Sequence, residues 1–328
     1  MKKFLGLLFL MLILNGCDDG DMTIETINFT DVQAGSCGET IYKLNGNEAI
    51  YIKIPGTLQP FTNEVTPVGS PKSIQIGSTA SGIVSVTYRA YDGAVTVNNI
   101  CTTPAPISPI ATEEWIATSG TIEIATIAVY STPDATTGGY QISKYLHNIV
   151  FKNVVFSKPS GTQVYERFPF GEYSTNATEL PLNFDPEDIS ICPSNQLLYN
   201  ARTNGIEGIY IQNFDPTLLD ITNLGVPKTA LISSNSNRLV YRLFQTALTA
   251  SNQDYFCSGT LPATPAINEE WIAKDGVDNV SGIIEVVTTT NGSGYLHTIT
   301  LKAATFQKDN NTFYLGNTYV MGTLLTAN

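Results

Sequence analysis

The chain contains the same series of landmarks twice, and this duplication constrains its fold more than any other feature. Ten landmarks recur in the same order, with an offset that stays between 149 and 162 residues. The clearest matched pairs are Cys101 and Cys257, Glu113–Ala117 and Glu269–Ala273, and Tyr145–His147 and Tyr295–His297. Each copy spans about 150 residues, which is enough to bury its own core. We therefore expect two tandem domains, at 22–172 and 180–328, with a polar linker at 173–179, and not a solenoid of short repeats.

Within each copy, apolar residues recur with a period of two, which is typical of strands. Thr121–Ile124 and Ile284–Val286 alternate in this way, and Gly, Pro, Asn and Ser separate the apolar runs. No stretch has the apolar spacing of an amphipathic helix over three turns. The fold class that follows is all-β, and domains of this size with many short strands favour sandwich-like architecture over closed barrels.

One segment differs in length between the copies. Eight residues separate Trp115 from Glu123, whereas fourteen separate Trp271 from Glu285, and the extra six fall within Asp275–Gly282. Because insertions are tolerated at surface loop tips, we expect the strands on either side to be the two arms of a hairpin. The alternative is that each Glu-Glu-Trp sequence begins a capped helix.

The N-terminus has the pattern of a signal peptide. Lys2 and Lys3 precede an apolar run, Phe4–Leu14, that is too short to span a membrane. The run ends in Leu14-Asn15-Gly16-Cys17, which resembles the lipobox of bacterial lipoproteins. The resemblance implies that residues 1–16 are a signal peptide and that Cys17 is acylated and serves as a membrane anchor.

The residues after Cys17 are acidic. Asp18, Asp19 and Asp21, in the segment 17–21, resemble the export signal of Bacteroidota surface lipoproteins. That resemblance implies an outer-membrane protein displayed at the cell surface, and the alternative is the periplasmic face. The whole chain has 17 basic and 29 acidic residues, so its net charge is −12. This excludes a nucleic-acid partner that is bound by phosphate neutralisation.

The other four cysteines divide equally between the copies. Cysteines of exported proteins usually form disulfides, and four cysteines allow three pairings. Because each ancestral unit must have closed its own bond, the duplication selects Cys37 with Cys101 and Cys192 with Cys257. A zinc site is not expected, since the chain has no Cys-x-x-Cys and only two histidines. No other metal and no cofactor is expected either.

His147 and His297 are matched residues, and on an alternating strand each shares a face with apolar side chains. We expect both to be neutral core histidines, and the alternative is a ligand or acid–base residue in a pocket. The adjacent glutamates at 113–114 and 269–270 point to opposite faces of a strand, so neither pair can flank one scissile bond.

Trp115 and Trp271 also occupy matched positions, which favours a core role, although an exposed tryptophan could stack on sugar rings. Asp275, Asp278 and Asn279 lie in the inserted segment and are candidate ligand-binding residues. Asp275 and Asp278 could contribute to a calcium site, but their spacing does not match an EF-hand and a polar loop is favoured.

Three classes of function remain open. The first is a non-enzymatic lipoprotein that binds a ligand, with a glycan as one candidate, and the second is a structural or adhesive protein that contacts other surface proteins. The third, a hydrolase, is least favoured, because the chain has no Gly-x-Ser-x-Gly motif. Ligand binding is expected where the copies differ, with Pro55–Val68 and Asp275–Gly282 as the best candidates.

Overall fold

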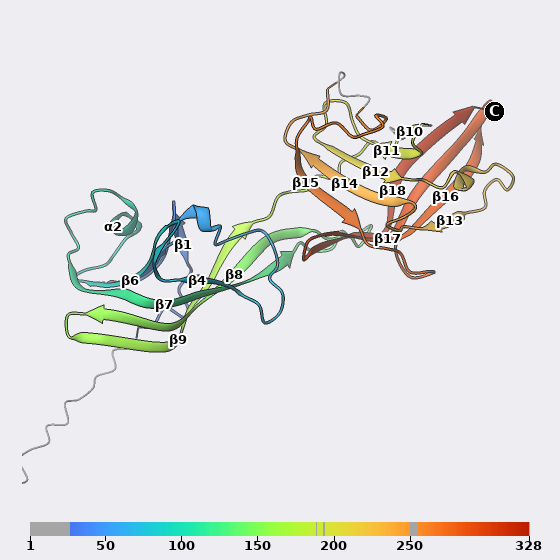
Figure 1. Ribbon diagram of the computed structural model, residues 1–328. Coiled ribbons are helices and arrows are strands. Elements are labelled where there is room, and N and C mark those ends of the chain that lie inside the picture. Colours follow the sequence, from blue (N-terminus) through green and yellow to red (C-terminus); the bar gives the residue numbers. More distant parts are fainter. Residues whose placement is uncertain (1–26, 188, 193, 250–254, 328) are drawn as a thin grey trace, which may run out of the picture.

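The computed structural model describes residues 27–187, 189–192, 194–249 and 255–327. These residues form two antiparallel sheets of nine strands each, so the protein is all-β with two sandwich-like domains. Figure 1 shows two lobes joined end to end, with the long strands of the first lobe reaching toward the second. No helix in the described part of the chain is both long and apolar enough to cross a membrane.

The first sheet has the strand order β1-β2-β3-β6-β7-β8-β9, with β4 beside β7 and β5 beside β6. Two short helical segments, η1 (Gly56–Leu58) and α2 (Val97–Cys101), accompany it. The strands are β1 (Gly35–Cys37), β2 (Thr40–Asn45), β3 (Glu48–Lys53), β4 (Lys72–Gln75), β5 (Gly77–Thr79), β6 (Gly82–Tyr91), β7 (Ala111–Tyr130), β8 (Ile142–Lys158) and β9 (Gly161–Asn176).

The second sheet has the order β10-β11-β12-β14-β15-β17-β16-β13, with β18 beside β17. A short 3₁₀ segment, η2 (Pro216–Leu219), precedes β13. The strands are β10 (Ile189–Cys192), β11 (Leu197–Asn200), β12 (Glu207–Gln212), β13 (Lys228–Leu231), β14 (Arg238–Phe244), β15 (Ile267–Ala273), β16 (Ile283–Asn291), β17 (Gly294–Lys308) and β18 (Asn311–Ala327).

Matched residues occupy matched places in the two sheets. Tyr88 pairs with Trp115 across β6 and β7, just as Tyr241 pairs with Trp271 across β14 and β15. The inward side chains of each domain form one main apolar core. Members of the first core include Ile52, Val86, Trp115, Phe151 and Phe170, and members of the second include Ile211, Tyr241, Trp271, Leu301 and Phe313.

The expected hairpin around the length difference is wrong, and so is the alternative of a helix start. In the first domain both segments belong to one continuous strand, β7. In the second domain β15 and β16 are separate, yet both pair with β17, so residues 274–282 interrupt one strand path. A loop inserted into a strand and a hairpin tip leave the same alternating pattern on both sides, and only the shared sheet partner distinguishes them.

Strand β7 has a glycine at the position where the loop 274–282 interrupts the strand path in the second domain, and this glycine allows β7 to be continuous. The pairing of β7 with β8 shifts register on both sides of Ser119, and Gly120 has a φ of +125°. A Cβ atom at Gly120 would lie 2.7 Å from the Cα of Val154, closer than real Cβ atoms approach. Glycine therefore allows β7 to bend tightly against β8.

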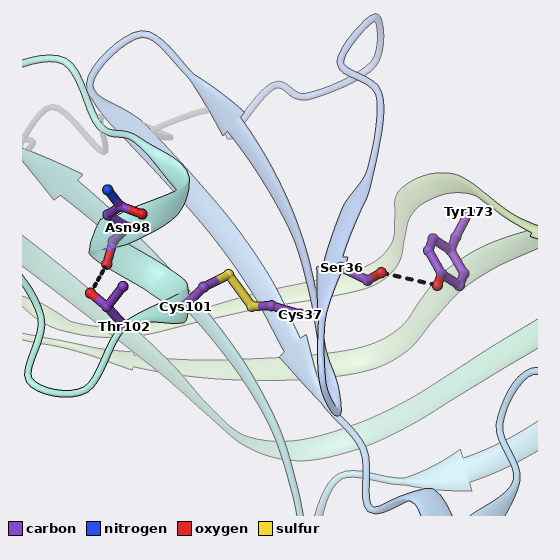
Figure 2. Close-up of a disulfide and its surroundings, with 6 residues drawn as sticks. All are labelled: Ser36, Cys37, Asn98, Cys101, Thr102 and Tyr173. Carbon is purple, nitrogen blue, oxygen red and sulfur yellow. Dashed lines mark hydrogen bonds between the residues drawn. A yellow bond between two sulfur atoms is a disulfide. The ribbon is translucent and has the colours of Figure 1, made fainter.

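Both predicted disulfides are present, each within one copy of the repeat. Cys37–Cys101 joins β1 to α2, and Cys192–Cys257 ties the end of β10 to the segment before β15. Figure 2 shows the first bond, with the Tyr173 hydroxyl of β9 donating to the Ser36 hydroxyl beside it (3.2 Å). Such bonds are typical of an oxidising, extracytoplasmic environment.

Two expectations concern segments near the domain ends. The segment expected as a linker, 173–179, is strand as far as Asn176. Half-buried and exposed side chains alternate along β9 up to this residue, and Tyr173 and Thr175 lie on the half-buried face.

The lipobox, Cys17 and the acidic residues that follow it lie outside the described residues.

Candidate functional site

The two tryptophans are buried, so neither ring offers a free face to a sugar. Trp115 is 1% exposed and Trp271 is 5% exposed. The Trp115 Nε1–H donates to Glu113 Oε1 at 2.6 Å. Trp271 is different, because its Nε1 has no hydrogen-bond acceptor among the described residues.

The adjacent glutamates do not converge on a common point. Glu114 forms an ion pair with Arg89, and Glu270 forms the equivalent pair with Arg242. The preceding glutamate of each pair turns to the opposite side of its strand, where Glu269 accepts from Lys308. Each of these carboxylates is thus engaged in a hydrogen bond or an ion pair with its own partner, and the two members of a pair do not face one common point.

Each histidine lies between two threonine hydroxyls, one at hydrogen-bond distance from each ring nitrogen, and we call this arrangement the Thr-His-Thr clamp. His147 is 0% exposed, with its Nδ1 2.9 Å from Thr126 Oγ1 and its Nε2 2.9 Å from Thr175 Oγ1. Burial lowers the pKa of His147 from 6.5 to about 4, which keeps the ring neutral.

The same clamp recurs in the second domain, where His297 lies between Thr288 (2.8 Å) and Thr326 (2.9 Å). Burial and, to a lesser extent, the charge of Lys228 lower the pKa of His297 as well. Because each ring is buried and both of its nitrogens lie at hydrogen-bond distance from protein hydroxyls, neither histidine is presented to a ligand.

The inserted loop of the second domain is held by local contacts. Asp275 Oδ1 accepts from the backbone N–H of Ser234 (2.8 Å), and Asp278 accepts from the Asn279 side chain (2.9 Å). Val277 and Val280 are exposed in the same loop. In the part of the chain that the structure describes, no group of three or more His, Cys, Asp or Glu side chains could hold a metal ion.

The other candidate segment, Pro55–Val68, contacts the second domain. Asn311 at the start of β18 accepts from the backbone N–H of Val65 (3.0 Å) and donates to the carbonyl of Asn63 (2.8 Å). Asn310 also donates to the carboxylate of Glu64 (3.1 Å). These bonds join residues almost 250 positions apart, so this segment docks one domain on the other.

A second segment of the first domain also crosses the junction. The loop between β7 and β8, residues 131–141, brings Tyr140 beside Tyr314 of β18, and the two exchange backbone hydrogen bonds of 2.8 and 3.1 Å. The N–H of Asn317 donates to the carbonyl of Thr137 (2.7 Å). The second domain has only a tight turn at the equivalent place, where Asn291 pairs with Gly294.

Beside this loop is a hollow of about 890 Å³, which we call the junction groove. Its wall consists of residues from the loop 131–141 and the start of β8, from the connection 176–182, and the β18 residues Tyr314, Leu315 and Tyr319. Tyr140 and Tyr314 lie 5.6 Å apart between ring centroids, and Tyr130 lies 5.2 Å from Tyr140. Tyr130 is 41% exposed and Tyr140 is 37% exposed, so these rings present aromatic surface to solvent.

The polar side chains of the junction groove are neutral or acidic. Asp134 and Glu179 line it together with Gln141 and Asn176, and no lysine or arginine is among its described lining residues. Hydrogen bonds from the backbone of Thr137 (2.7 Å) and Thr136 (2.9 Å) hold the pKa of Asp134 below its usual value. The groove thus combines aromatic rings with carboxylate and amide oxygens, a combination suited to the apolar faces and hydroxyls of sugars.

No family model matches the chain, and no curated protein or solved structure is similar to it.

Sequence reasoning missed the junction groove, although the sequence contained a signal for it. The offset between the copies is 162 residues at Glu123 and Glu285 but 150 at Tyr145 and Tyr295. The difference of twelve residues is the extra length of the loop that leads to Tyr140. The matched residues show where in the chain this extra loop lies, but the contact of the loop with β18 depends on how the two domains meet.

Proposed function

We propose that the protein is a lipid-anchored, non-enzymatic surface protein that binds a carbohydrate chain in the junction groove. The observation that carries this proposal is a row of three tyrosines: Tyr140 and Tyr314 line the groove, and Tyr130 packs against Tyr140. Tyr130 ends β7 just before the loop 131–141, which the second domain does not have, and Tyr140 lies in that loop. Duplicated core packing does not account for these two exposed rings, whereas ligand binding does.

Anchoring follows from the resemblance of Leu14-Asn15-Gly16-Cys17 to a lipobox. The acyl chains on Cys17 insert into the outer membrane, and the acidic residues after it direct the protein to the cell surface. Removal of residues 1–16 takes away two lysines and no acid, so the mature chain has 15 basic and 29 acidic residues, a net charge of −14. The lipid must supply the attachment, because anionic head groups repel such a body.

A structural or adhesive function is the second candidate, and the long edge strand β9 favours it. Exposed edges can pair with a strand of another protein. However, β9 contains Pro169 in its middle and the charged residues Glu166 and Arg167, and both features oppose pairing at an edge. The groove therefore supports ligand binding better than the edge supports adhesion.

The test of binding is a glycan panel screened with the full chain carrying Cys17→Ser, followed by calorimetry on any ligand found. Tyr140→Ala keeps the backbone bonds to Tyr314 and removes the ring, so affinity should fall roughly 5-fold or more, about 1 kcal/mol for one stacked ring. Tyr295→Ala, a tyrosine on β17 outside the groove lining, is the matched control and should bind as the unaltered chain does. Equal binding by the Tyr140 and Tyr295 variants would refute the groove as the site.

The test of anchoring uses the same substitution at residue 17 in cells. Cys17→Ser should release the protein from membranes or leave its signal peptide uncleaved. A variant that is processed and fractionates with membranes as the unaltered protein does would contradict acylation. Cleavage of the intact protein by protease added to whole cells distinguishes surface display from the periplasmic face.

A further inference from the structure

The indole N–H of Trp271 is a buried donor for which the protein itself supplies no acceptor. Trp271 is 5% exposed, and no acceptor among the described residues lies within hydrogen-bond distance of Nε1. Buried polar groups in native proteins almost always have a partner, either in the protein or in ordered water, because an unpaired group loses its bond to solvent. An unpaired N–H in this position therefore points to a bound partner.

In the first domain the equivalent indole N–H, that of Trp115, has an acceptor within its own domain. There the Trp115 N–H donates to Glu113, two residues earlier on the same strand. Glu269 is the counterpart of Glu113, but both of its oxygens are engaged elsewhere. Oε1 accepts from the Thr178 hydroxyl at 3.2 Å, and Oε2 accepts from Lys308 Nζ at 2.5 Å.

Thr178 belongs to the segment that connects the two domains. Its bond to Glu269 holds that carboxylate away from Trp271, so the indole N–H lacks the acceptor that Glu113 provides to Trp115. Lys158, the counterpart of Lys308, lies instead over the Trp115 ring, 4.6 Å from its centroid. The two tryptophans thus have the same place in the fold and different hydrogen bonding. The difference coincides with the domain contact.

A cavity of about 20 Å³ lies beside Trp271, where the two domains meet. Its lining includes Asn63 and Tyr145 from the first domain and Glu269 and Asn311 from the second. A volume of this size is enough for one water molecule, which needs roughly 10–15 Å³, and far too small for a sugar. Burial and, to a lesser extent, the negative charge of Glu269 across the junction raise the pKa of Tyr145 to about 12.

We propose that one water molecule is bound in this cavity, where it accepts the Trp271 N–H and donates to oxygen atoms from both domains. Water is the ligand that fits this chemistry. A metal cation cannot accept a hydrogen bond from the indole, and the Glu269 carboxylate would repel an anion. The water has two hydrogens to donate, one to an oxygen of Tyr145 or Asn63 in the first domain and one to Glu269 in the second, because each carboxylate oxygen can accept more than one hydrogen bond. The water thus joins the two domains at their buried contact. The proposal does not rest on carbohydrate binding in the junction groove, although Ile142, Ala177 and Leu180 line both hollows.

The experiment is proton NMR of the full chain with Cys17→Ser and labelled tryptophan, in which Trp115→Phe and Trp271→Phe assign the two indole signals. In a rotating-frame experiment the Trp271 N–H should show a cross-relaxation peak to water of sign opposite to that of chemical exchange. In the laboratory-frame experiment the same peak should have the sign that marks a long-lived bound molecule. Trp115, whose N–H is bonded to Glu113, is the built-in control and should show none. If Trp271→Phe does not fold, Trp115→Phe alone assigns both signals.

The absence of a water peak at Trp271, or equal peaks at both tryptophans, would overturn the proposal. A high-resolution crystal structure provides a second measurement on the unaltered sequence. Electron density for one water within hydrogen-bond distance of Trp271 Nε1 supports the proposal. Density that places the Glu269 carboxylate on that nitrogen, as Glu113 lies on Trp115, refutes it.

Discussion

His147 should make the protein lose stability in mild acid. In the folded protein its ring is buried and neutral, with a pKa lowered from 6.5 to about 4 by desolvation. In the unfolded chain the same ring takes up a proton as the pH falls through about 6.5. The unfolded state therefore binds more protons between these two values, and the free energy of unfolding falls as the pH decreases through that window.

The magnitude follows from the difference between the two pKa values. Integration of the linkage gives a loss of roughly 2 kcal/mol between neutral pH and about pH 5, and roughly 3 kcal/mol once the pH is below about 4. The full contribution of the neutral ring is present above about pH 6.5, where both states are unprotonated. His297 adds to the loss in the same direction, because burial lowers its pKa too.

The perturbation is His147→Gln, which does not titrate and has an amide that can still bond to the hydroxyls of Thr126 and Thr175. Urea unfolding of the unaltered chain and of the variant at about pH 7.5 and about pH 5 gives the free energy of unfolding in each condition. The variant should lose roughly 2 kcal/mol less than the unaltered chain over this interval. His297→Gln is the matched variant in the other domain, and the double variant should lose least.

Equal losses in the unaltered chain and in His147→Gln would refute the reasoning, since they would show that the ring is not desolvated. An NMR titration is an independent check. A pKa for His147 at or above 6.5 would mean that water or a carboxylate reaches the ring, contrary to the burial on which the magnitude rests.

Three further outcomes are expected. Cys37→Ser combined with Cys101→Ser should lower the free energy of unfolding by about 4 kcal/mol, the chain-entropy value for a loop of this length, as measured by urea unfolding, and an unchanged midpoint would contradict it. Asn311→Ala removes two hydrogen bonds across the junction, so small-angle scattering should show a larger radius of gyration, and Asn235→Ala should leave it unchanged. Replacement of residues 274–282 by Thr-Ser-Gly, the sequence at 118–120, should shift the melting temperature only slightly, because β7 shows that the strand path can continue without the loop, and loss of folding would refute the shared path.

Much of the fold could be predicted from the sequence because its causes are local or duplicated. Alternation of apolar residues is a property of neighbouring positions, and it correctly predicts an all-β protein. The duplication adds a constraint on distant residues, since each copy must rebuild the same core. It selects the two disulfide pairings and explains why each histidine lies between two threonines, although the spacing of residues along the chain does not identify those threonines.

Sheet partners could not be predicted in the same way. The segment Asp275–Gly282 has identical flanking patterns whether it ends a hairpin or interrupts a strand, and only the shared neighbour β17 distinguishes the two. The end of β9 is a second example. Strand β9 runs to Asn176, and its last residues bond to distant partners, Tyr173 to Ser36 and Thr175 to His147.

The sequence by itself determined the duplicated β-domains, their internal disulfides and the burial of matched residues, because one repeating pattern acts within each copy. Only the tertiary structure decided what the unmatched segments do. Pro55–Val68 and the loop 131–141 lie in the first domain, yet their partners, Asn311 and Tyr314, lie in the second. No periodicity links such residues, since a docking contact depends on the shapes of two finished domains. The junction groove and the cavity at Trp271 both arise from that contact, so neither exists until the domains are folded and joined.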